Sequence, residues 1–329
     1  MLIARHILAT FIMPAYLCQM NNSQLIKEIT TGNYRALARG ISLVENEADG
    51  YEILLSGVSS YYNNVIGVTG PPGAGKSTLV DCLIKEIIAE NKKVGVICVD
   101  PSSPFNRGAI LGDRIRMSQW YNHPNVFIRS LSSRGSMGGL HPKIIEITDL
   151  MNAAGFDYVI IETIGVGQTE IEIAGLANVT LVVVVPESGD SIQTMKSGLM
   201  EIADIFVLNK YDRPGADEYL RNLYDTLNLE DNRSIPVIKT IAEQAYGVDA
   251  LYQAIRHTLE NNPAADKKYW LLAQKAYHLI QANKMAGIDK KEIFEQISRY
   301  INEHNKFNLY QFIKPYTVEP EAVNFKTTL

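Results

Sequence analysis

Cysteine is scarce in this chain of 329 residues, which contains only Cys18, Cys82 and Cys98. No C-x-x-C pair, histidine-rich run or other metal-ligand spacing accompanies them, so the sequence offers neither a disulfide framework nor a zinc site. Cys82 and Cys98 fall in a helix and a strand that the pattern predicts, where we expect them to be small core residues. This usage fits a reduced, cytoplasmic compartment best.

The sequence also has no large excess of either charge and no long uninterrupted apolar run. The formal net charge of −5 argues against nucleic acid or an anionic membrane as the main partner. The apolar run from Ile7 to Cys18 is interrupted by Pro14, is too short for a membrane span and is followed by no A-x-A-like cleavage site. We therefore expect residues 1–20 to be a packed or disordered extension, or to reflect a start assigned upstream of Met20.

The stretch from Gly70 to Thr78 carries the most specific signal in the chain. It contains the pattern G-x-x-x-x-G-K-[ST] of a phosphate-binding loop, with a buried strand predicted before it and an amphipathic helix after it. Backbone N–H groups and the helix N-terminus would hold phosphates, Lys76 would reach the β- and γ-phosphates, and the Ser77 hydroxyl would ligate Mg²⁺. The nucleotide-binding residues expected here are Gly70, Pro71, Pro72, Gly73, Ala74, Gly75, Lys76, Ser77 and Thr78.

Acidic side chains follow two further predicted strands. Asp100 ends an apolar run and begins a long loop, rich in Gly, Pro and Ser, that also contains Asp113. Such long connections are usually functional, and binding residues of open α/β sheets lie at the carboxyl ends of strands, although Asp100 as a helix cap in a surface loop is an alternative. Glu162 ends another strand and Gly165 follows, which is the layout of a GTPase γ-phosphate sensor with Glu in place of the usual Asp.

A guanine-reading pattern follows the predicted strand 205–208. Asn209, Lys210 and Asp212 form N-K-x-D, in which the Asp carboxylate accepts hydrogen bonds from the guanine N1–H and exocyclic amine. Adenine offers neither pattern, so the site should reject it. The Lys210 stem would lie along the base, and Asn209 would tie this loop to the phosphate loop. A turn that often contacts the base through backbone N–H groups is expected at Ile241, Ala242 and Glu243.

Taken in order, the elements predict an α/β fold of the P-loop NTPase class. It has a mostly parallel central sheet flanked by helices, an N-terminal helical segment and a C-terminal helical arm, and the most hydrophobic strand, 181–185, should be central. The amphipathic arm must bury its apolar stripe by folding back on the chain or against a partner subunit. The expected divisions are an extension over 1–20, a helical segment over 21–60, the nucleotide-binding domain over 61–262, and a helical arm with its tail over 263–329.

Several stretches together resemble the methylmalonyl-CoA mutase-associated GTPase family. The resemblance implies a GTPase that acts as a chaperone of an adenosylcobalamin-dependent acyl-CoA mutase, gating cofactor loading and the exchange of damaged cofactor. It implies no cobalamin site on this chain itself. Beside the phosphate loop, it is carried by D-P-S-S-P from Asp100, L-G-D-R-I-R-M over 111–117, S-R-G-S-M-G-G over 133–139, E-T-I-G-V-G-Q-T-E over 162–170, G-D-S-I-Q over 189–193 with Lys196, N-K-Y-D over 209–212, and R-A-L-A-R-G-I-S-L-V-E over 35–45.

The resemblance also assigns roles within the chain. By motif position, Ser77, Asp100, Asp113 and Glu162 form the Mg²⁺ shell, directly or through water. The family is homodimeric through a C-terminal helical arm, which favours burial of the arm's apolar stripe against a partner subunit. The implied switch segments are 100–117, 162–170 and 186–198, the last of which would answer the partner through Asp190, Gln193 and Lys196.

Some features depart from the family or leave the function open. Asn106 and Arg107 stand where many relatives have a small residue and Gly, and residues 306–329 match no family pattern. The catalytic candidates are Lys76, Asp113 and Glu162, with Arg107 and Arg134 as arginines that could reach the phosphates; no general base is evident.

Other functions compete with this reading. A GTPase for nickel insertion into hydrogenase or urease would be expected to carry a His-rich tract or paired Cys, which the chain lacks. A small-molecule kinase or a transport ATPase subunit is disfavoured by N-K-x-D and by the lack of a transporter signature. The mutase served, whether methylmalonyl-CoA, isobutyryl-CoA or another type, stays open.

Overall fold

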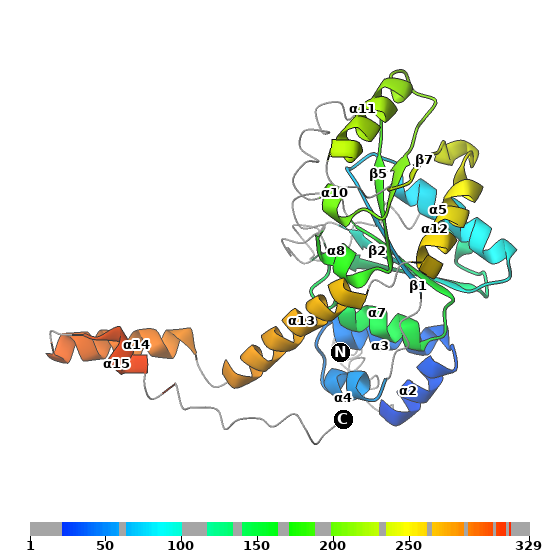
Figure 1. The fold of residues 1–329 in the computed structure, drawn as a ribbon. Helices are drawn as coiled ribbons and strands as arrows, with labels where there is room; N and C mark the ends of the chain where they lie inside the picture. Colours follow the sequence, from blue (N-terminus) through cyan, green and yellow to red (C-terminus); the bar gives the residue numbers. More distant parts are fainter. Residues whose placement is uncertain are drawn as a thin grey trace, which may run out of the picture. The chain divides into compact units, whose positions relative to one another are not determined.

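The computed structural model describes residues 22–58, 64–100, 117–133, 140–163, 171–187, 199–229, 235–261, 265–285, 289–304, 307–313 and 316. Its centre is a seven-stranded sheet of order β3-β2-β4-β1-β5-β6-β7, parallel throughout (Figure 1). The strands are β1 (Asn64–Thr69), β2 (Val94–Asp100), β3 (Val126–Ser132), β4 (Tyr158–Glu162), β5 (Val179–Val184), β6 (Ile205–Leu208) and β7 (Val237–Lys239).

This sheet confirms the predicted fold class. Most strands are continuous Val- and Ile-rich runs buried along their whole length, as parallel strands covered on both faces require. The strand expected to be central, β5, is an interior strand beside β1, and β1 itself occupies the middle of the sheet. The phosphate loop therefore follows the middle strand.

Helices cover both faces of the sheet (Figure 1). On one face, α5 and α12 pack against alternate strand residues such as Ile66 and Val68. On the other, α7 and α8 pack against the intervening residues such as Val65, because successive side chains of a strand point to opposite faces. A third cluster joins β5 and β6 to α10 and α11. The helices are α5 (Lys76–Ala89), α7 (Ile144–Ala153), α8 (Ile171–Leu176), α10 (Leu199–Ile202), α11 (Ala216–Leu229) and α12 (Val248–Asn261).

Three helices precede β1, namely α2 (Asn22–Thr30), α3 (Tyr34–Glu45) and α4 (Tyr51–Ser56). They share a buried core with α7 and α8. Ion pairs reinforce the packing: Arg129 of β3 lies 2.9 Å from Glu45, and Lys143 lies 3.2 Å from Glu47. The predicted helical segment is thus present as part of the layer over one face of the sheet. With six residues, α4 is too short for hydrophobic periodicity to predict it.

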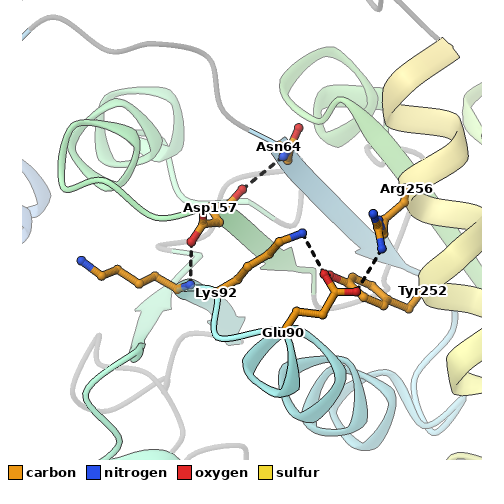
Figure 2. A network of polar contacts seen from close by, with 7 residues as sticks. Asn64, Glu90, Lys92, Asp157, Tyr252 and Arg256 are labelled. Atoms are coloured by element: carbon orange, nitrogen blue, oxygen red, sulfur yellow. Dashed lines mark hydrogen bonds and ion pairs between the residues drawn. The ribbon is translucent and has the colours of Figure 1, made fainter.

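A polar network joins α5 to α12 at the edge of the sheet where the strands begin (Figure 2). Glu90, which caps the end of α5, lies 2.8 Å from Lys92 and 3.0 Å from Arg256 of α12, and accepts a hydrogen bond from the Tyr252 hydroxyl at 3.1 Å. The hydrogen bond from Lys92 is the main cause that holds the pKa of Glu90 below its ordinary value. The phosphate-loop helix is therefore anchored at the end remote from the loop.

The chain divides after Leu271 into two compact units. The second unit contains most of α13 (Ala265–Met285), together with α14 (Lys290–His304) and α15 (Leu309–Ile313), which form the predicted helical arm. Large apolar side chains on these helices are exposed, including Trp270 by 67%, Phe294 by 69% and Tyr310 by 78%. Within the described ranges, no helix has both the length and the apolarity that a membrane span needs.

Candidate functional site

The phosphate loop follows β1 and leads into α5. Gly70 has a φ of 135°, and a Cβ there would lie 2.0 Å from the Val183 carbonyl oxygen. Gly75 has a φ of 87°, and its Cβ would lie 2.4 Å from the Asn209 amide nitrogen. These two positions require glycine for both backbone conformation and space.

Lys76, the first residue of α5, places a positive charge inside the loop. Its buried ammonium donates hydrogen bonds to the carbonyl oxygens of Gly70 at 2.8 Å and Pro71 at 3.1 Å. No described side chain caps the start of α5, so the N–H groups of its first turn add to the positive potential. A lysine ammonium beside a helix N-terminus favours a polyanion such as a phosphate chain.

Three of the four side chains predicted to hold Mg²⁺ belong to described elements: Ser77 lies in the first turn of α5, Asp100 ends β2 and Glu162 ends β4. The Ser77 hydroxyl donates to Glu162 Oε1 at 2.7 Å, and both residues are buried. Glu162 is in register with Cys98 of β2, two residues before the buried Asp100, so the two carboxylates lie on the same face of adjacent strands. Hydroxyl and carboxylate oxygens suit Mg²⁺, which usually takes one or two carboxylates together with nucleotide phosphates and water. The donors present therefore fit this ion.

Other predicted residues lie outside the described residues. Among those that the structure describes, no three His, Cys, Asp or Glu side chains group to hold a metal ion. The third predicted carboxylate, Asp113, is not among them, and the roles assigned to the Mg²⁺ residues stay predictions. Also outside are Gly165, Arg107, Arg134, Asp190, Gln193 and Lys196.

Asn209, which is 2% exposed, joins the phosphate loop to the base-reading loop. Its Nδ2 donates to the Ala74 carbonyl oxygen at 2.8 Å. Its Oδ1 accepts from the Thr240 hydroxyl and from the Ala242 N–H, each at 3.1 Å. The predicted tie between the two loops is present, and it extends to the turn after β7.

The remaining residues of the base-reading elements are more accessible. Lys210 is half-buried and has a φ of 55°, and Asp212 is exposed. An accessible carboxylate suits a group that is to receive N–H donors from a base. The turn begins with Ile241, whose N–H donates to the Tyr246 carbonyl oxygen at 3.1 Å, and continues as η3 (Ala242–Gln244), with Glu243 exposed. Binding of a base by these residues stays a prediction.

Two side chains of α5 that no motif marks also support the site. The half-buried Cys82 donates from its thiol to the Ala242 carbonyl oxygen at 3.2 Å, and burial is the main cause that raises the pKa of this thiol. Asp81 accepts hydrogen bonds from Gln119 Nε2 at 2.9 Å and Trp120 Nε1 at 2.6 Å, which attach η2 (Ser118–Trp120) to α5. These contacts depend on tertiary packing, so sequence reasoning identified Cys82 only as a core residue and missed Asp81.

Comparison with known proteins gives a consistent result. The model of the family described as methylmalonyl Co-A mutase-associated GTPase MeaB matches residues 37–295. A protein of Pyrococcus horikoshii is 40% identical, over 84% of this chain and 90% of its own. The GTPase ArgK of Escherichia coli is 32% identical, over 88% of each chain.

Two further matches concern a fused protein and a solved structure. A fused isobutyryl-CoA mutase of Geobacillus kaustophilus is 34% identical over 74% of this chain, which corresponds to 24% of that protein. The crystal structure of a LAO/AO transport system kinase superposes with a TM-score of 0.63 at 25% identity, covering 91% of this chain and 98% of its own.

Proposed function

The chain belongs to the methylmalonyl-CoA mutase-associated GTPase family, and from this premise we propose that it hydrolyses GTP with Mg²⁺ as the chaperone of an adenosylcobalamin-dependent acyl-CoA mutase, in the first place methylmalonyl-CoA mutase. GTP binding and hydrolysis would gate cofactor loading and protect or reactivate the mutase. The fused relative supports an acyl-CoA mutase as the partner, because a segment similar to this chain forms part of a protein named as an isobutyryl-CoA mutase. The proposal includes a cytoplasmic location.

The observation that carries the nucleotide assignment is the junction at Asn209, where one buried amide joins the phosphate loop, Thr240 directly after β7, and the base-reading turn. In our proposal, the Asp212 carboxylate accepts the N1–H and the amine of guanine, and adenine is rejected because it would leave that carboxylate unpaired. The proposed nucleotide-binding residues are Gly70, Pro71, Pro72, Gly73, Ala74, Gly75, Lys76, Ser77, Thr78, Gly165, Asn209, Lys210, Asp212, Ile241, Ala242 and Glu243.

Hydrolysis requires attack of a water molecule on the γ-phosphorus with GDP as leaving group. Mg²⁺, held by Ser77 with Asp100, Asp113 and Glu162 directly or through water, would neutralise charge on the phosphate oxygens when bound. The Lys76 ammonium would exchange its bonds to the loop carbonyls for bonds to β- and γ-phosphate oxygens. Glu162 and Asp113 are the candidates to orient the attacking water and accept its proton.

The proposed organisation assigns residues 1–20 to an extension, 21–60 to a helical segment, 61–262 to the GTPase domain, and 263–329 to a dimerisation arm with its tail. Support for the arm's role comes from its exposed apolar side chains, such as Phe294 and Tyr310. Exposed apolar side chains of this kind are buried most readily against another protein surface, here a second copy of the chain.

The test is GTP turnover by the full chain, alone and with purified methylmalonyl-CoA mutase or isobutyryl-CoA mutase. We expect Mg²⁺-dependent phosphate release that at least one mutase changes. Lys76→Ala should abolish turnover in all reactions, because the charge that stabilises the transferred phosphoryl group is lost. A rate that neither mutase alters, together with no binding of either mutase in the presence of a non-hydrolysable GTP analogue, would contradict the chaperone role.

A further inference from the structure

Tyr211 occupies the variable position of N-K-x-D. It contacts Thr240, Asp217 and Lys239, and the motif itself requires none of these contacts. We infer that Tyr211 is a positioning residue that aims the Asp212 carboxylate at the guanine base. This inference rests on the proposed function, since it concerns how that site distinguishes guanine from related bases.

The backbone around Tyr211 is held in an uncommon conformation. Lys210, directly before it, has a φ of 55°, which a side chain other than glycine adopts only at a cost in free energy. The Tyr211 N–H donates to the Thr240 carbonyl oxygen at 3.1 Å, and the Arg213 N–H donates to the Lys210 carbonyl oxygen at 2.9 Å. These bonds lie on both sides of Asp212, so they constrain the backbone that carries its carboxylate.

The Tyr211 side chain adds contacts with β7 and α11. Its hydroxyl donates to the Asp217 carboxylate in the first turn of α11, and its ring packs on the apolar cluster of β5, β6 and α11. The Lys239 ammonium of β7 lies 4.6 Å from the ring centroid, a cation–π arrangement. Interaction with Tyr211 is the main cause that raises the pKa of Lys239, which agrees with this placement.

These contacts matter because the Asp212 side chain is itself exposed. Guanine offers two donors, and accepting both requires a carboxylate fixed in distance and direction. A carboxylate whose position varies can still accept a hydrogen bond from N1–H, but it accepts the second bond, from the exocyclic amine, less often. Loosening the loop should therefore weaken guanine binding more than binding of hypoxanthine, which has N1–H but lacks the exocyclic amine.

The experiment compares GDP and IDP affinities, by competition with a fluorescent GDP analogue, for wild type, Tyr211→Phe, Tyr211→Ala and Asp217→Asn. We expect wild type to prefer GDP by about tenfold or more. Tyr211→Ala should lose about tenfold in GDP affinity and about threefold or more of the GDP-to-IDP preference, as expected for a lost hydrogen bond. Tyr211→Phe and Asp217→Asn keep the ring on its apolar support and should show smaller losses in the same direction.

Tyr269→Phe is the matched control, because it removes the hydroxyl of an exposed tyrosine of α13, outside the base-reading elements, and should change neither affinity. If Tyr211→Ala and Tyr211→Phe keep the wild-type preference, or lose GDP and IDP affinity equally, Tyr211 supports only the fold and the inference is wrong. If wild type itself shows no preference for guanine, the proposed GTPase function fails and the inference fails with it. The wild-type measurement thus separates the two failures.

Discussion

Replacing Asn209 by alanine is the perturbation that best tests whether the two nucleotide loops form one unit. The change removes three side-chain hydrogen bonds: one to Ala74, one from Thr240 and one from the Ala242 N–H. Because Asn209 is only 2% exposed, water cannot readily replace these partners. The substitution therefore leaves buried polar groups without their partner on two different loops.

The magnitude follows from the contacts. Each neutral hydrogen bond contributes about 0.5–1.5 kcal/mol net, and a buried polar group left unsatisfied costs about 1–3 kcal/mol. We expect Asn209→Ala to lower the free energy of unfolding by about 3 kcal/mol, a large part of the 5–15 kcal/mol of a typical domain. GDP affinity should fall by about tenfold or more, because the two loops are no longer held in alignment. A tenfold loss corresponds to about 1.4 kcal/mol of binding free energy.

Urea denaturation followed by circular dichroism measures the first quantity, and titration with a fluorescent GDP analogue measures the second. Asn178→Ala is the matched control: the Asn178 side chain accepts one hydrogen bond, from the Val65 N–H at 2.9 Å, at the start of β1. It should cost about 1 kcal/mol and leave GDP affinity unchanged. If Asn209→Ala costs no more than this control, or binds GDP as wild type does, the loops are not coupled through Asn209.

Two further substitutions test the base-reading and phosphate loops. Asp212→Asn should shift preference from GTP toward xanthosine triphosphate, because an amide can donate to the xanthine O2. Turnover of both nucleotides measures this preference, and unchanged GTP selectivity would contradict the base-reading role. Gly70→Ala should abolish nucleotide binding and lower the melting temperature, since its Cβ would lie 2.0 Å from the Val183 carbonyl oxygen. Gly73→Ala shares a positive φ of 78° but meets no described atom within 4 Å, so it should cost only about 1–2 kcal/mol; equal losses would refute the steric argument.

Local patterns in the sequence were sufficient to predict much of the sheet. The apolar runs 158–162 and 205–208 coincide with β4 and β6, because buried parallel strands have few polar positions and end at the functional loops. The helix after the phosphate loop begins at Lys76, inside the motif itself, where an amphipathic pattern has not yet started. The N-terminal helices illustrate the limit, since the sequence predicts a helical segment there but not that it packs against α7 and β3.

The support around the site was less predictable. No motif marks Asp81 or Cys82 as residues that support the site. No motif marks Thr240 either, although its hydroxyl donates to Asn209 in the structure. Tyr211 lies inside a recognised motif, yet its partners come from α11 and β7. Such residues act by contact with distant parts of the chain, which composition and spacing do not encode.

The sequence by itself determined the chemistry available: the glycines that permit positive φ in the phosphate loop, the lysine and serine beside them, the acids at strand ends and the N-K-x-D residues. These are local properties of short segments, so spacing reveals them. The N-K-x-D pattern already predicts that Asn209 meets the phosphate loop. Only the tertiary structure decided that its partner there is the Ala74 carbonyl oxygen, 135 positions earlier, and that Ser77 meets Glu162, 85 positions later. Those meetings depend on the order of the strands, which is set by how both faces of the whole sheet are packed.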